Sequence, residues 1–163
     1  MKPAPPAPST APTAASAPSL RYVRRIHATA DAVFQAFVDP REILCWWCPD
    51  DGPVLSAETD VRVGGRFRVA FKTTDGELHE THGEYLEIDR PRRLVLGWWW
   101  SDTPHLRTRV TVTIEPLSGG AELTVLHEGF HDVETRDRHE AGWVHATLRL
   151  AARVELANEE NRT

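Results

Sequence analysis

Cys45 and Cys48 are the only cysteines of the chain, and they flank two tryptophans in the run CWWCP. A C-x-x-C pair could form a dithiol redox site or half of a metal site. A redox cysteine is activated at the N-terminus of a helix, whereas this pair follows the short helix predicted before it. A structural zinc site needs four ligands, and the sequence has no second pair. We therefore expect no metal and no cofactor, and interpret both cysteines as small residues beside an aromatic cluster.

The run HETHGE, residues 79–84, is a second candidate for chemistry. On a strand, Glu80, His82 and Glu84 point to the same face. Two carboxylates and an imidazole could hold a metal there. The same alternation is typical of a solvated sheet face, and we favour that interpretation. Tyr85 then faces the interior, whereas a bulge near Gly83 would reverse the facing.

The tryptophans of the run LVLGWWW alternate between the two faces of a predicted strand. Trp98 and Trp100 are expected to face inward, as core residues or as an aromatic wall for a flat ligand. Trp99 then faces outward, where an exposed apolar patch would indicate an interface.

Three histidines in the last third of the chain are candidates for acid–base chemistry. His127 ends a strand that reads as inward-facing, where it could serve as a general acid or base. We favour a structural histidine with satisfied hydrogen bonds. His139 and His145 lie on different faces of the last predicted helix by their spacing, and we interpret both as ordinary.

These residues must be positioned by a mixed set of elements. Residues 21–28 read as a strand, and two short helices follow, capped by Thr29 and by Asp39 with Pro40. From about residue 53 to 128 the apolar residues alternate with period two between turn signals, which predicts six strands in an antiparallel meander. Residues 132–157 read as one long helix, whose apolar stripe includes Trp143 and Thr147 and is widened by Val144, Leu148 and Ala151. The prediction is an α+β fold in which this helix covers a curved sheet.

Composition excludes several classes of protein. The net charge of −5 argues against a nucleic-acid partner. No apolar run is long enough to span a membrane, and the N-terminus lacks the apolar segment of a secretory signal. Six of the twelve prolines lie in residues 1–19, which we expect to be a disordered tail. We expect one domain over residues 20–157, a short tail over residues 158–163, and a cytoplasmic location.

The order of these elements resembles the helix-grip fold of the START-like (Bet v 1-like) or SRPBCC superfamily. Within it, the chain is similar to the branch called activator of heat-shock-protein-90 ATPase homologue-like. The resemblance rests on several runs in the right order along nearly the whole body of the chain. They are ADAVFQAFVDP, WWCPD, VGGRFRV, GEYLEIDRPRRLVLGW, VTVTIEP, LTVLHEG and the Gly142-Trp143 pair.

The resemblance implies a deep cavity between the sheet and the long helix, which relatives use for apolar or aromatic small molecules. It brings no catalytic motif, so no catalytic residue is assigned. The expected function is binding of such a molecule. Alternatives are a cyclase or dehydratase enzyme and a co-chaperone-like interaction module, although a chaperone partner is not expected and a homodimer stays open. The expected ligand-binding residues are Trp46, Trp47, Phe67, Val69, Phe71, Tyr85, Trp98, Trp100, Val112, His127, Trp143 and Thr147.

Overall fold

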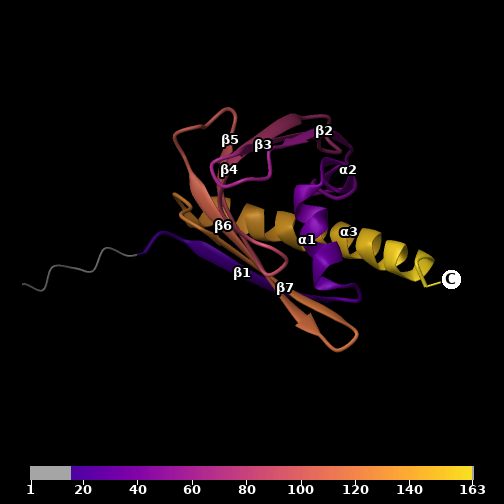
Figure 1. The fold of residues 1–163 in the computed structure, drawn as a ribbon. Coiled ribbons are helices and arrows are strands. Elements are labelled where there is room, and N and C mark those ends of the chain that lie inside the picture. The colour runs from indigo at the N-terminus through magenta and orange to yellow at the C-terminus, as the bar shows by residue number, and fades with distance from the viewer. Residues whose placement is uncertain (1–15, 163) are drawn as a thin grey trace, which may run out of the picture.

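The computed structural model describes residues 16–162 and shows one curved sheet with helices on its concave side (Figure 1). Residues 1–15, which make up most of the predicted tail, lie outside the described part. The strands are β1 (Ser19–Ile26), β2 (Val54–Thr59), β3 (Arg66–Lys72), β4 (Leu78–Asp89), β5 (Arg93–Trp100), β6 (Thr108–Leu117) and β7 (Gly120–Glu128). The helices are α1 (Ala30–Val38), α2 (Pro40–Ile43) and α3 (Val133–Glu160).

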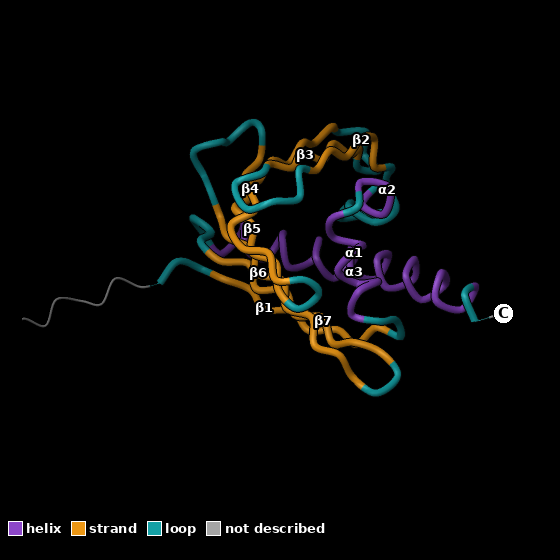
Figure 2. Tube along the Cα trace, viewed as in Figure 1, coloured by secondary structure: helices purple, strands orange, loops and turns teal. Residues whose placement is uncertain are grey.

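All seven strands form one sheet in the order β1-β7-β6-β5-β4-β3-β2, with antiparallel neighbours throughout. From β2 to β7 each strand pairs with the next one along the chain, which confirms the predicted meander. Only β1 is paired out of sequence, because it closes the other edge against β7. The long helix α3 runs across the concave side of the sheet (Figure 2). The predicted α+β fold is therefore confirmed, with β1 placed two residues earlier than expected.

The predicted helix starts are confirmed by their capping contacts. The Thr29 hydroxyl accepts a hydrogen bond from the Ala32 N–H, and the Asp39 carboxylate accepts one from the Arg41 N–H. Asp132 caps α3 by accepting from the Thr135 N–H. These contacts satisfy N–H groups that have no partner inside the helix. The other end of α3 was predicted too early, because the helix continues through residues 158–160 to Glu160.

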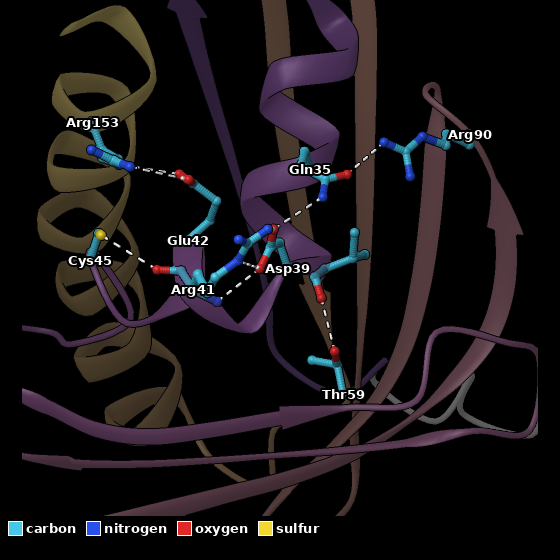
Figure 3. A network of polar contacts seen from close by, with 9 residues as sticks. Gln35, Asp39, Arg41, Glu42, Cys45, Thr59, Arg90 and Arg153 are labelled. Carbon is cyan, nitrogen blue, oxygen red and sulfur yellow. Dashed lines mark hydrogen bonds and ion pairs between the residues drawn. The ribbon is translucent and has the colours of Figure 1, made fainter. Parts of the chain in front are cut away.

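A polar network ties the two short helices to the rest of the molecule (Figure 3). The Asp39 carboxylate also accepts from the Gln35 side chain, whose amide oxygen accepts from Arg90 at 2.6 Å. From α2, Glu42 forms an ion pair with Arg153 of α3 at 3.3 Å. The segment that follows α2, which contains both cysteines, is thereby held next to α3.

The core lies between the concave sheet face and helices α1 and α3. Helix α1 packs on β6 and β7, and α3 packs on β1. The inward facing predicted for β5 is confirmed for Leu94, Leu96 and Trp98, which are 0%, 2% and 6% exposed. On α3 the predicted apolar stripe is buried. Its expected widening is confirmed at Ala151, which is buried, but is wrong at Val144 and Leu148, which are exposed.

On the convex face, the Trp99 side chain is less exposed than its outward facing suggested. It points outward as expected but is only 6% exposed. The Arg107 guanidinium covers the ring at 4.1 Å, and the His82 ring stacks 6.4 Å from it. An arginine over an indole face is a favourable cation–π contact. Trp99 therefore forms no exposed apolar patch.

The HETHGE strand has the predicted facing. Thr81 and Tyr85 are buried, and the outward His82 contacts Glu80 at 2.8 Å. Arg68 also binds that Glu80 carboxylate, at 3.3 Å. Among residues 16–162 no group of three His, Cys, Asp or Glu side chains is arranged to hold a metal ion. Within the same range, no helix is both long and apolar enough to cross a bilayer.

Candidate functional site

A partly open cavity of about 730 Å³ lies at one end of the concave face. Four segments surround it: the stretch after α2, the β3–β4 turn, the β5–β6 loop, and the first half of α3. Its lining residues are Trp46, Trp47, Cys48, Pro49, Asp50, Phe71, Thr73, Asp75, Leu78, His79, Glu80, Trp98, Trp100, Ser101, Asp102, Thr103, Leu106, His131, Thr135, Arg138, His139, Gly142, Trp143 and Ala146. Five of the six tryptophans of the chain are among them.

The structure places half of the twelve expected residues on this wall. Those on it are Trp46, Trp47, Phe71, Trp98, Trp100 and Trp143. Those off it are Phe67, Val69, Tyr85, Val112, His127 and Thr147, all buried in packed surroundings. The cavity does not extend along the whole sheet because α1 packs on β6 and β7. Phe34 and Phe37 of α1 belong to the core cluster that contains Val112.

The wall tryptophans contact one another in a continuous chain. Trp47 stacks on Trp98 with ring centroids 5.1 Å apart and planes 12° apart. Trp98 in turn contacts Trp100 at 6.2 Å and Trp143 at 5.7 Å, both with inclined planes. Offset-stacked and edge-to-face contacts are the favourable geometries for aromatic rings. The wall is therefore a continuous aromatic surface built from β5, α3 and the segment after α2.

Trp46 completes the end of α1. Its indole N–H donates to the Ala36 carbonyl at 2.8 Å. In a continued helix that carbonyl would accept from the N–H of residue 40, but residue 40 is proline and has none. The indole supplies the missing donor, which explains why a tryptophan follows the α1–α2 junction.

The two cysteines occupy different environments. Cys45 is exposed and donates to the Arg41 carbonyl, whereas Cys48 is buried and contacts the Asp50 carboxylate at 3.3 Å. Burial raises the pKa of the Cys48 thiol, which disfavours the reactive thiolate. Cys48 therefore lacks the setting that activates a redox cysteine.

A buried histidine, His127, and a half-buried one, His139, lie behind and beside the tryptophan wall. His127 is fully buried, as predicted, and its nitrogens contact Trp143 at 3.1 Å and Thr108 at 2.7 Å. His139 was read as ordinary, and that is wrong: it lines the cavity and accepts from the Trp100 indole at 3.1 Å. Burial lowers the pKa of both imidazoles. The overlooked signal was spacing, since His139 precedes Trp143 by one helical turn.

Sequence reasoning also missed the polar rim. It comes from loops and from the start of α3 and includes Asp75, Asp102, His131 and Arg138. These residues carry no periodic signal, because three of them sit outside strands and helices. Deeper in the wall, the Trp98 indole N–H is buried without a hydrogen-bond partner in the described structure. The site thus has an apolar aromatic floor and a charged entrance.

Asp50 holds one side of this entrance together. Its carboxylate accepts from the N–H groups of Gly52 and Thr74, at 2.8 and 3.0 Å, and from the Thr74 hydroxyl. Burial raises the pKa of Asp50, but these hydrogen bonds outweigh it and lower the pKa to about 2. The carboxylate therefore ties the segment after α2 to the β3–β4 turn.

We expect Asp50→Asn to lower the free energy of unfolding by about 1 kcal/mol at neutral pH, because an amide is a weaker acceptor than a carboxylate. A lowered pKa contributes stability above the ordinary value of 3.8, and this contribution is lost as pH falls toward 2. Urea unfolding at pH 7 and pH 3 measures both effects. Asp51→Asn is the matched control, since within residues 16–162 the exposed Asp51 carboxylate has its polar contact with His145. Equal behaviour of the two variants would contradict this role of Asp50.

Comparisons with known proteins agree with this architecture. A protein from Chromobacterium violaceum is 30% identical, with a TM-score of 0.75 over 84% of this chain and 96% of its own. The AHSA1 protein from Silicibacter pomeroyi is 25% identical, with a TM-score of 0.75 over 86% of this chain and 99% of its own. An AHSA1-like protein from Aeromonas hydrophila, 23% identical, shares the fold with a TM-score of 0.72 over 86% and 94% of the two chains. No curated protein matches the chain.

The helix-grip fold with its end cavity is one that supports ligand-binding domains in general. The family model described as "Activator of Hsp90 ATPase homolog 1-like protein" matches residues 27–155, well over half of the chain. That span runs from just after β1 to the last part of α3 and includes every residue of the cavity wall. The chain therefore belongs to the Activator of Hsp90 ATPase homolog 1-like family, within the START-like superfamily.

Proposed function

We propose that this protein binds an apolar or aromatic small molecule in the tryptophan-lined cavity. The observation that supports it is the concentration of five of six tryptophans on one wall. Small-molecule sites are concave, mostly apolar and of about 300–1,000 Å³, a range that contains the 730 Å³ found here. A flat ring system would lie against the half-buried Trp100 ring and the small exposed parts of the other four indoles, which are 1–6% exposed.

The hydrogen bonds of His127 and His139 support binding better than catalysis. Both nitrogens of His127 have hydrogen-bond partners, and so do both nitrogens of His139. Neither imidazole is then free to take a proton from a bound molecule. Tyr85 is off the wall, and burial raises the pKa of its phenol. The cyclase or dehydratase alternative stays a prediction, as do the cytoplasmic location and a homodimer.

Two aromatic compounds and one aliphatic compound test the proposal: 1-naphthol, phenanthrene and dodecanoate. A ligand that binds only the folded state stabilises it by about 2.7 kcal/mol at 100 times its dissociation constant. We expect the two aromatic compounds to raise the melting temperature and to titrate as one site in isothermal titration calorimetry. A shift with dodecanoate alone would redirect the proposal to aliphatic ligands, and no shift with any of the three would contradict it.

Substitutions at two neighbouring tryptophans test where the ligand binds. Trp100→Leu removes part of the wall and is expected to weaken 1-naphthol binding about fivefold, the equivalent of about 1 kcal/mol of ring contact. Trp99→Leu is the matched control, because Trp99 lies on the opposite face of the same strand under Arg107. Equal affinities of the two variants would place the ligand outside this cavity.

A further inference from the structure

Two of the wall tryptophans donate their indole N–H groups to histidine side chains. The Trp100 indole N–H lies 3.1 Å from His139 Nε2, and the Trp143 indole N–H lies 3.1 Å from His127 Nδ1. An indole nitrogen can only donate. Each of these two imidazole nitrogens must therefore be an unprotonated acceptor.

The second nitrogen of each ring fixes the tautomer. His139 Nδ1 lies 2.8 Å from the Thr135 carbonyl, which can only accept, so Nδ1 carries the proton. His127 Nε2 lies 2.7 Å from the Thr108 hydroxyl, to which it donates. The two imidazoles are thus neutral, in opposite tautomers, and each holds one tryptophan.

The surroundings of the two rings oppose a positive charge. Their centroids are 5.4 Å apart, and Phe130 packs 4.4 Å from His127 and 4.9 Å from His139. Burial lowers the pKa of His139, the hydrogen bond to the Thr135 carbonyl opposes this, and the nearby charge of Arg138 lowers the pKa further. His127 is fully buried on β7, faces His139, and has its pKa lowered well below 6.5. His139 lines the cavity and is the more accessible of the two.

We propose that His139 and His127 are positioning residues whose neutral imidazoles hold Trp100 and Trp143 in the cavity wall, so that aromatic-ligand binding is lost when His139 becomes charged. The ligand-binding part rests on the function proposed above. Protonation turns Nε2 of His139 into a donor that faces the donor of Trp100. The two groups then repel, and the Trp100 ring leaves the position that closes the wall between β5 and α3.

The direction of the pH effect follows from the lowered pKa. The ordinary histidine value is 6.5, and His139 lies below it in the folded protein. The wall therefore keeps its form above pH 6.5 and loses it as pH falls through the pKa of His139. One unit below that pKa only about one molecule in eleven is neutral, so apparent affinity for 1-naphthol falls about tenfold.

The first experiment needs no ligand. In ¹H–¹⁵N spectra of the free protein, the six tryptophans each give one indole N–H signal, assigned by single Trp→Phe variants. We expect the Trp100 signal to move as pH falls from 7.5 to 5, while the signal of Trp46, whose indole N–H donates to the Ala36 carbonyl, stays. The spectra are recorded in a His79→Gln background, because the His79 ring lies 6.1 Å from the Trp100 ring. In His139→Gln the amide oxygen still accepts from the indole but cannot titrate, so the Trp100 signal should then keep its position at all pH values.

Three further variants make the result decisive. His139→Leu, which has no acceptor, should show a displaced Trp100 signal already at pH 7.5. His145→Gln is the control, because His145 is on the same helix but contacts Asp51 outside the cavity. It should titrate like the wild type. His127→Gln tests the second pair through the Trp143 signal. A Trp100 signal that ignores pH in the wild type, or that titrates unchanged in His139→Gln, would overturn the proposal.

The second experiment measures 1-naphthol affinity by calorimetry from pH 7.5 to 5. Wild type and His145→Gln should bind progressively more weakly below pH 6.5, whereas His139→Gln should bind equally throughout. A pH-independent wild-type affinity would overturn the link between His139 and binding. If 1-naphthol fails to bind at every pH, the proposed function fails for this ligand, and the indole spectra still decide the role of His139.

Discussion

Trp46→Ala is expected to lower the free energy of unfolding by about 3–5 kcal/mol, the usual range for deleting a buried aromatic side chain. The ring is 1% exposed and packs 5.1 Å from both Phe37 and Trp47. Its loss leaves a cavity and also leaves the Ala36 carbonyl without a donor, because Pro40 has no N–H.

Trp46→Phe separates the two causes. It keeps most of the ring volume but loses the N–H, so its expected cost is about 1–3 kcal/mol, the range for a buried polar group left unsatisfied. Urea unfolding of the three proteins at pH 7 measures the difference. If Trp46→Phe were as stable as the wild type, the indole would not be replacing the proline donor.

Gly83→Ala is expected to cost about 3 kcal/mol, the upper range for overpacking a core, or to prevent folding. A Cβ at this position would lie 2.1 Å from the Phe67 ring and 2.4 Å from the Gly97 carbonyl. The ring could turn, but the neighbouring strand backbone cannot withdraw without breaking the β4–β5 pairing. Glycine is therefore needed at position 83, because the Phe67 ring occupies the space that a Cβ would take.

Gly97→Ala is the matched control for this prediction. Gly97 lies on the neighbouring strand β5, and a Cβ there would meet its nearest atom at 3.9 Å, an ordinary contact. We expect its effect to stay within about 1 kcal/mol of the wild type, as for a residue with room for a methyl group. Thermal unfolding of both variants tests the pair, and equal losses would show that glycine is needed at both positions for another reason.

Local signals explain what the sequence could predict. Thr29, Asp39 and Asp132 were identified as caps because capping depends on contacts within three residues along the chain. The inward facing of Trp98 and the outward facing of Trp99 followed from the strict period of a strand. These features fix the fold without knowledge of distant contacts.

The extent of the cavity could not be predicted in the same way. Val112 and Thr147 face inward as expected, but whether inward space is filled or hollow depends on where α1 packs. The polar rim depends on loop conformations without a periodic pattern. His139 was missed because its importance lies in a contact with Trp100, 39 residues away in sequence.

The most direct test of the central claim is to add 1-naphthol to the ¹⁵N-labelled protein at pH 7.5 and follow its six indole N–H signals. If the cavity binds aromatic molecules, the signals of Trp47, Trp98, Trp100 and Trp143 should shift and saturate together with one dissociation constant. The Trp99 signal should remain in place, because that ring lies on the opposite sheet face. A saturating shift of Trp99 alone, or no saturating shift of any wall signal, would contradict the account.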